Sequence, residues 1–248
     1  MNLRNIPLRR WMFAALCLVL GLVCLRLGFW QLARLEQRRA HNRLVLDRQG
    51  LPPLRLETAI PDAEVPFRSV IARGRFDSAH QVVLGNRARE GRPGLHLVTP
   101  LRLEGSEWSL LIDRGWIPSE SGAIGDLEGY TIDGVVEVSG IALPTQVEPG
   151  WKFLADRATT PQEPLQIWRV LSVPGIQSQI PYPLLPYFLA QREPADGLQG
   201  PVPDVEIDLS EGPHLGYALQ WFAFSSIALL GGGIWLVRGA RAARKQAE

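Results

Sequence analysis

Two apolar runs, one near each end of the chain, restrict its fold more than any other feature. The C-terminal run extends from Leu215 to Val237 without a charged residue, and Arg238 ends it. As a helix, this run would be about 34 Å long at roughly 1.5 Å per residue, which exceeds the roughly 30 Å of a bilayer's hydrocarbon core. The sequence therefore predicts a transmembrane helix over residues 213–237.

The N-terminal run predicts a second transmembrane helix. Residues 11–25 carry no charge, and the run continues to Phe29 with only Arg26 inside it. A cleaved signal peptide is the alternative interpretation, because basic residues precede the run. However, the run is followed by Gly28-Phe29-Trp30-Gln31-Leu32-Ala33-Arg34 and not by a small-x-small cleavage site. We therefore interpret residues 11–31 as an uncleaved membrane anchor.

Basic residues beside the two runs predict how the chain crosses the membrane, because Lys and Arg gather on the cytoplasmic side. The flanking cations are Arg4, Arg9 and Arg10 before the first run, and Arg238, Arg241, Arg244 and Lys245 after the second. They predict a cytoplasmic N-terminus (1–10), a cytoplasmic basic tail (238–248) and an extracytoplasmic domain over residues 32–212. A further basic cluster, Arg34–Arg43, opens that domain, but charge counts carry less weight in a long translocated segment.

Composition narrows the location and the partners of the chain. A net charge of +1 over 248 residues argues against a nucleic-acid partner. The short N-terminus leaves no room for a transit peptide, so we expect a bacterial inner membrane, with lipid around both helices. The two cysteines, Cys17 and Cys24, lie in the first run, so disulfides do not hold the outer domain together.

The residues between the runs follow a strand-like pattern. Short apolar and alternating stretches are separated by Gly- and Pro-rich turns, which is typical of a small antiparallel barrel or sandwich. The predicted strands are 68–76, 81–85, 95–103, 108–116, 131–143, 166–170 and 187–190. The third and fourth form the clearest hairpin, with a turn at Glu104-Gly105-Ser106-Glu107. The predicted fold class is therefore a membrane protein in which two transmembrane α-helices flank an antiparallel β-rich extracytoplasmic domain.

Three local features add detail to this fold. Gly134 and Gly140 predict bulges in the strand over 131–143. Residues 172–180 predict a short helix, with Pro174 suited only to its start. Residues 36–47 predict a polar continuation of the first transmembrane helix.

Motifs of enzymatic chemistry are missing from the sequence. It contains no glycine-rich phosphate loop, no paired-histidine metal spacing and no Gly-x-Ser-x-Gly nucleophile elbow. Asp77, Ser78 and His80 resemble part of a catalytic triad, but a turn between two strands is the simpler interpretation. A membrane-anchored hydrolase therefore has no motif to support it, and we expect the chain not to be an enzyme.

Polar and aromatic residues gather where the two apolar runs meet the outer membrane surface. Four open the second run and three close the first: His214, Tyr217, Gln220 and Trp221, and Trp30, Gln31 and Arg34. Two interpretations are open. The residues form an interfacial aromatic belt with snorkelling arginines, or His214 ligates a haem iron while the arginines bind its propionates.

Five motifs, in their order and spacing, give the chain a family resemblance over nearly its whole length. They are Leu27-Gly28-Phe29-Trp30-Gln31-Leu32-Ala33-Arg34, Leu84-Gly85-Asn86-Arg87 with Gly91 and Gly94, Val98-Thr99-Pro100-Leu101, Asp113-Arg114-Gly115-Trp116-Ile117-Pro118 and His214-Leu215-Gly216-Tyr217-Ala218-Leu219-Gln220-Trp221-Phe222. The chain resembles the surfeit-locus (Surf/Shy) family of cytochrome c oxidase assembly factors. Members commonly carry Asn where this chain has Asp113.

The resemblance implies a membrane chaperone that helps to deliver haem a to the catalytic subunit of a haem–copper terminal oxidase. It also implies that His214 matches the family's haem-ligating histidine. Haem a synthase is the implied donor. Arg87 and Arg114 lie in family motifs, and we interpret them as structural arginines that bind backbone carbonyls. The alternative function is a haem-independent membrane scaffold that stabilises an oxidase assembly intermediate.

Overall fold

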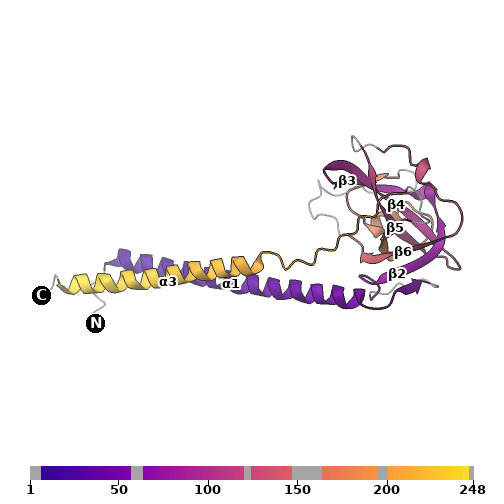
Figure 1. Cartoon of the computed structure of the whole chain (residues 1–248). Coiled ribbons are helices and arrows are strands. Elements are labelled where there is room, and N and C mark those ends of the chain that lie inside the picture. The colour runs from indigo at the N-terminus through magenta and orange to yellow at the C-terminus, as the bar shows by residue number, and fades with distance from the viewer. Residues whose placement is uncertain (1–6, 57–63, 120–123, 147–163, 195–199, 246–248) are drawn as a thin grey trace. The chain divides into compact units, whose positions relative to one another are not determined.

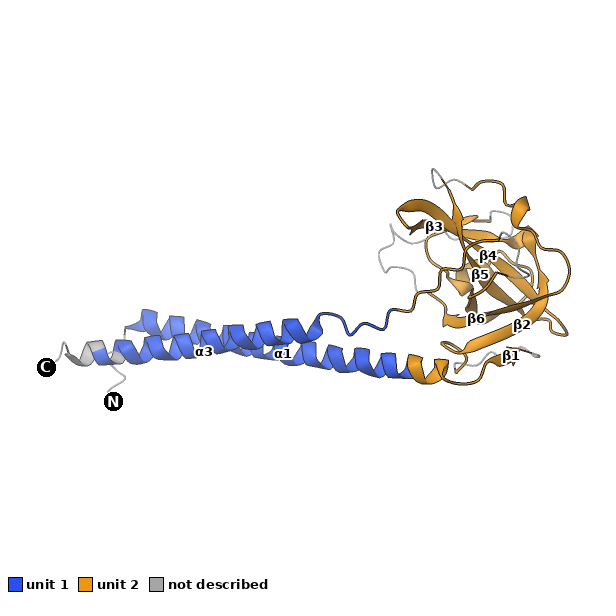
Figure 2. Ribbon diagram, in the orientation of Figure 1, with its two compact units in different colours: residues 1–44, 208–248 blue, residues 45–207 orange. Residues whose placement is uncertain are grey.

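The structure is a computed structural model that describes residues 7–56, 64–119, 124–146, 164–194 and 200–245. The chain divides into two compact units (Figure 2). The first contains residues 1–44 and 208–248, and the second contains residues 45–207.

Two long helices form the first unit. Helix α1 covers Leu8–Gln49 and helix α3 covers His214–Lys245, and they lie side by side (Figure 1). Both are long and apolar enough to cross a membrane, and only 11% of the most apolar window of each is buried. The apolar side chains thus face outward, as they do in helices that contact lipid. The core helix of a soluble protein would instead bury them. Helix α1 continues to Gln49, which confirms the predicted polar extension.

Small residues line the contact between α1 and α3. On α3 the buried positions Ala218, Ser225 and Gly232 recur every seven residues, which is the spacing of helices that pack along a seam. The Ser225 hydroxyl donates a 2.8 Å hydrogen bond to the Gly21 carbonyl of α1. A Cβ added at Gly232 would lie 2.6 Å from Cys17 Cβ, so the backbones approach too closely for a larger residue.

The second unit is built around a closed barrel. Among the described residues, eight strands form one sheet in the order β1-β2-β6-β8-β5-β4-β3-β7. Pairing of β2 with β4 closes the five strands from β2 to β4 into a barrel, and β1, β3 and β7 extend it. The strands are β1 Leu54–Leu56, β2 Ser69–Phe76, β3 Val82–Arg89, β4 Arg92–Leu103, β5 Ser109–Pro118, β6 Val136–Pro144, β7 Ile167–Trp168 and β8 Leu184–Gln191. Within the described parts of the connections lie the short helical segments η2 Ser78–His80, η3 Glu128–Tyr130 and α2 Val173–Gln177.

Closure depends on the C-terminal end of β2. Gly74 pairs with Val136 of β6 on one side and with Leu103 of β4 on the other. A Cβ at Gly74 would collide with the Arg102 carbonyl oxygen. Glycine is therefore required where β2 passes from one neighbouring strand to the other.

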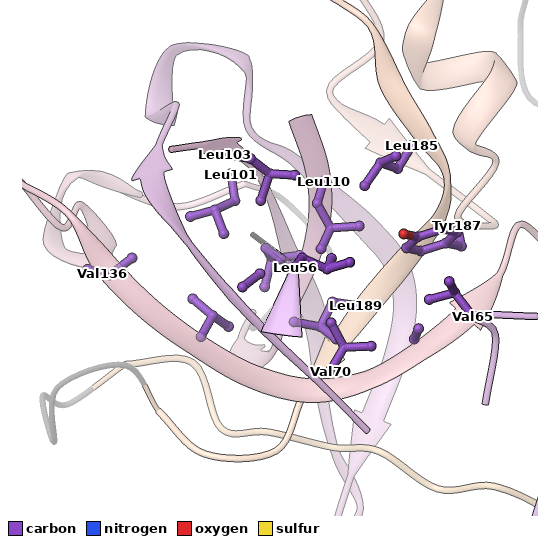
Figure 3. Packing of buried hydrophobic residues seen from close by; sticks show 14 residues of the cluster. Leu56, Val65, Val70, Leu101, Leu103, Leu110, Val136, Leu185, Tyr187 and Leu189 are labelled. Atoms are coloured by element: carbon purple, nitrogen blue, oxygen red, sulfur yellow. The ribbon is translucent and has the colours of Figure 1, made fainter. Parts of the chain in front are cut away.

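The barrel interior is a cluster of apolar side chains that includes Leu101, Leu110 and Leu189 (Figure 3). A second apolar cluster, around Trp168 and Ile176, lies on other faces of the same strands and is covered by α2. Strand β4 is consequently buried without a break from residue 94 to residue 101. Because successive side chains of a strand point to opposite faces, this unbroken burial means that both faces of β4 are covered.

Most of the predicted strands are confirmed, and the hairpin joins β4 to β5 with Leu101 opposite Leu110. The predicted bulges are wrong, because β6 pairs with β2 without a register shift from Val136 to Ile141, and Gly134 precedes the strand. The sequence also did not predict β1, a three-residue strand parallel to β2.

Candidate functional site

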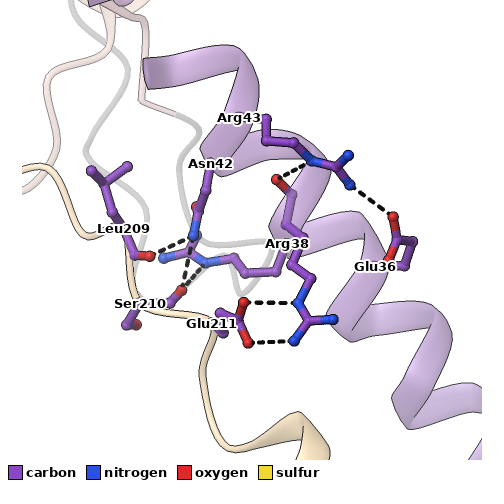
Figure 4. A network of polar contacts seen from close by, with 8 residues as sticks. Glu36, Arg38, Asn42, Arg43, Leu209, Ser210 and Glu211 are labelled. Carbon is purple, nitrogen blue, oxygen red and sulfur yellow. Dashed lines mark hydrogen bonds and ion pairs between the residues drawn. The ribbon is translucent and has the colours of Figure 1, made fainter. Parts of the chain in front are cut away.

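The segment that leads into His214 is held against α1 by a group of polar contacts that we call the clasp. It consists of Arg38, Arg39 and Asn42 of α1 and residues 208–211 (Figure 4). Arg39 makes a two-pronged ion pair with Glu211, with Nε–Oε1 and Nη2–Oε2 distances of 2.8 and 2.9 Å. This bidentate geometry fixes the relative orientation of the two side chains as well as the distance between them.

Backbone carbonyls complete the clasp. Arg38 donates from Nε to the Ser210 carbonyl at 2.9 Å and from Nη2 to the Asp208 carboxylate at 2.7 Å. The Asn42 amide donates to the Leu209 carbonyl. Hydrogen bonds from Ser210 lower the pKa of Asp208. Two arginines of the basic cluster therefore pair with acidic residues that lie just before helix α3 in the sequence.

His214 is the first residue of α3 and faces α1. Its Nδ1 lies 2.9 Å from Oε1 of Gln31, and both side chains are half-buried. An amide oxygen only accepts hydrogen bonds, so the imidazole donates from Nδ1, and in the neutral ring this arrangement puts the lone pair on Nε2. The structure records no hydrogen bond to Nε2 from the residues it describes.

Gly212 lies beside the free nitrogen of this imidazole. A Cβ added there would be 3.5 Å from His214 Nε2, and the glycine has a φ of +69°. A side chain at this position would contact this edge of the ring, and the positive φ also favours glycine.

Of the seven predicted site residues, His214 and Gln31 are the two that a recorded hydrogen bond joins. Trp30 and Tyr217 are 50% and 48% exposed, so their rings are not packed into the protein. Trp221 is half-buried and meets Phe224 edge to face at 6.0 Å between ring centroids. The remaining two residues, Gln220 and Arg34, are exposed.

The arginines at the end of the first span differ in their partners. Arg34 donates to Gln37 Oε1 at 3.1 Å and has no ion pair within the described part of the chain, whereas Arg38 and Arg39 are both paired. Sequence reasoning noticed the basic cluster but missed its acidic partners. The signal in the sequence was the position of Asp208 and Glu211, two acidic residues just before the second apolar run.

The arginines of the β motifs have structural roles. Arg114 is 2% exposed, and its Nη1 donates to the Tyr130 carbonyl at 2.7 Å while the guanidinium lies 4.8 Å from the Phe76 ring centroid. Burial lowers its pKa to about 10. Arg87 donates to the carbonyls of Gly85 and Arg169, both at 3.4 Å. The interpretation of both side chains as carbonyl-binding arginines is confirmed.

An aspartate network occupies the predicted triad-like turn. Asp77 Oδ2 accepts from His80 Nδ1 at 2.8 Å and from the Tyr182 hydroxyl at 2.6 Å. Burial opposes ionisation of Asp77, but the hydrogen bonds from Tyr182 and His80 outweigh it and lower the pKa of the carboxyl. The third member of the network is Tyr182 and not Ser78, so the arrangement is that of a braced turn rather than a nucleophilic triad.

Comparison with known proteins places the chain in a family. The model of the SURF1 family matches residues 18–226, which include most of α1, the whole barrel and the start of α3. The chain belongs to the SURF1 family. This family is generally known as one of oxidase assembly factors.

Named relatives agree with the family over most of the chain. A SURF1-like protein of Rickettsia felis is 24% identical over 82% of this chain and 87% of its own length. The Surfeit locus protein 1 of Arabidopsis thaliana is 25% identical over 63% of this chain and 48% of its own length. An uncharacterized SURF1-like protein of Mycobacterium bovis is 23% identical over 88% of this chain and 79% of its own length.

Proposed function

We propose that this SURF1-family chain is a membrane-anchored assembly factor that helps to deliver haem a to the catalytic subunit of a haem–copper terminal oxidase. It acts without turnover, accepting the haem from its synthase and passing it on. Both helices cross a bacterial inner membrane, the two termini are cytoplasmic, and the barrel lies on the periplasmic side. Family membership supports the assembly role, and the free imidazole nitrogen at the start of α3 supports the haem role.

The donor set at this site suits a haem iron. Nε2 of His214 has no recorded hydrogen-bond partner among the described residues, and imidazole is a common axial ligand of haem. Within the described residues, no group of three or more His, Cys, Asp or Glu side chains is placed to hold a metal ion. His214 would be the residue of this chain that holds the haem iron.

Side chains near the start of α3 and on α1 support the proposal, because they would offer a porphyrin aromatic and cationic contacts. Trp30 and Tyr217 expose aromatic surface on α1 and α3, against which an apolar macrocycle stacks. Arg34, which has no acidic partner in the described structure, is our proposed partner for a propionate. Arg38 and Arg39 are assigned instead to the clasp, because both already bind acids.

The haem role is tested by purifying the full-length chain in detergent from cells that make haem a. We expect a haem absorbance spectrum in the wild type and loss of most of the bound pigment in His214→Ala. The matched control is His41→Ala, which removes an exposed imidazole from α1. Equal pigment in wild type and His214→Ala would remove His214 from the role.

The scaffold function is separated from the haem function by measuring oxidase in the same cells. If haem delivery is the task, His214→Ala lowers the haem a content of the assembled oxidase. If the chain is a haem-independent scaffold, His214→Ala supports normal oxidase levels, while substitutions on the barrel surface abolish assembly.

A further inference from the structure

We propose that Gln31 is a positioning residue for His214: its amide oxygen holds the imidazole in the tautomer that carries hydrogen on Nδ1, so that Nε2 alone is presented to the haem iron. This inference rests on the proposed function, because it concerns how His214 meets its ligand. The observation that carries it is the 2.9 Å contact between Gln31 Oε1 and His214 Nδ1.

A free imidazole in water exchanges its proton between two nitrogens, and either one is then able to bind metal. An acceptor fixed at Nδ1 removes that choice and fixes the ring's rotation as well. Metal-binding histidines generally have such a partner on the second nitrogen, and it also raises the basicity of the ligating nitrogen. Gln31 stands in this relation to His214.

Gln31 itself is held by the packing of α1 against α3. Gly28, three residues before it, and Leu35, four residues after it, are both buried. A Cβ at Gly28 would collide with the Phe222 ring of α3, so the helices are in close contact one turn from Gln31. The amide is thus fixed by a rigid pair of elements and not by a loop.

The other ring nitrogen, Nε2, has no recorded hydrogen-bond partner among the described residues. Gly212 lies next to Nε2 and offers no side chain, and even a Cβ at this position would stand 3.5 Å from that nitrogen. The two ring nitrogens therefore differ, because Nδ1 faces the Gln31 acceptor and Nε2 faces a glycine that has no side chain to bind it. Ligation from the Nε2 side is the only geometry that keeps the Gln31 bond.

The experiment titrates haemin into the detergent-solubilised full chain and measures the dissociation constant and the reduction midpoint potential. Gln31→Leu removes the acceptor, and we expect haemin affinity to fall about tenfold, the lower end of the effect of losing such a partner. Gln31→Glu keeps an acceptor that cannot donate. It should bind near the wild-type affinity, and its midpoint potential should be lower, because a carboxylate makes the ligating imidazole more basic.

A double variant tests whether Gln31 acts through His214. In a His214→Ala background, Gln31→Leu should cause no further loss of haemin affinity. A purely structural role for Gln31 would lower affinity in both backgrounds and leave the potential of Gln31→Glu unchanged, which would overturn the proposal. Circular dichroism identifies any variant that has not folded, and the Gln31→Glu potential then decides the question.

The same haemin measurements distinguish an error in the role of Gln31 from an error in the haem function of His214. If His214→Ala loses haemin while Gln31→Leu binds with wild-type affinity and potential, the positioning role is wrong and the haem role stands. If wild type and His214→Ala bind haemin equally, the haem role itself is wrong.

Discussion

Single carboxylates in this protein are stabilised by several donors each. Asp77 accepts bonds from His80, from Tyr182 and from the Ala79 backbone N–H, so one side chain joins η2 to the approach of β8. Burial and the bond to Asp77 together raise the pKa of the Tyr182 phenol, which keeps the hydroxyl protonated as the donor. The turn predicted from Asp77-Ser78-Ala79-His80 was therefore correct, whereas Tyr182 was invisible to that local pattern.

The lowered pKa of Asp77 predicts a pH-dependent contribution to stability. Because the folded-state pKa lies below the ordinary value of 3.8, the stabilisation is present above that value and is lost as pH falls through the lowered pKa. Asp77→Asn should lower the melting temperature at pH 7, and its difference from wild type should shrink in acid. Thermal denaturation in detergent between pH 7 and strongly acidic pH measures this. The exposed carboxylate Asp133, changed to Asn, is the control, and a pH-independent difference at Asp77 would contradict the prediction.

At the scale of elements, the α1–α3 pair depends on the absence of side chains along one seam. Helix α3 carries three consecutive glycines at 231–233, but only the middle residue faces α1. A helix turns by about 100° per residue, so three consecutive glycines point in three directions and a partner helix meets one of them.

This difference allows a matched test within one helix. Gly232→Leu places a large side chain where even a Cβ would lie 2.6 Å from Cys17, and we expect it to destabilise the helix pair by about 1–3 kcal/mol. Gly231→Leu adds the same side chain where nothing lies within 4 Å, and it should have little effect. The melting temperatures of the two variants in detergent, each compared with the wild type, measure this difference in stability. Equal losses at the two positions would mean that the seam does not lie where the structure has it.

For the whole molecule, two units of different character share one chain. The first consists of helices with outward apolar faces, and the second is a barrel whose apolar residues are enclosed. The arginines near the outer end of the first span, which argued against the predicted topology, include two that are paired with Asp208 and Glu211. Charge counts carry less weight in a long translocated segment, so these arginines do not by themselves decide the orientation.

Cysteine labelling tests that orientation. With Cys17 and Cys24 changed to Ala, a cysteine at the exposed position 107 in the β4–β5 turn should react with a membrane-impermeant maleimide on intact spheroplasts. A cysteine at the exposed position 241 near the end of α3 should react only after the membrane is opened. The reverse pattern would invert the proposed topology, and labelling of both positions in intact spheroplasts would exclude two crossings.

The sequence by itself determined the two apolar helices, the β4–β5 hairpin and the presence of an imidazole at the start of α3. These features depend on residues that are close in the chain, where hydrophobicity, periodicity and turn chemistry act directly. The tertiary structure alone decided the closure of the barrel by β2 and β4, the clasp and the pairing of His214 with Gln31. Gln31 and His214 are separated by 183 positions, and a hydrogen bond between them exists only because small residues let α1 and α3 pack closely enough to bring the two side chains together.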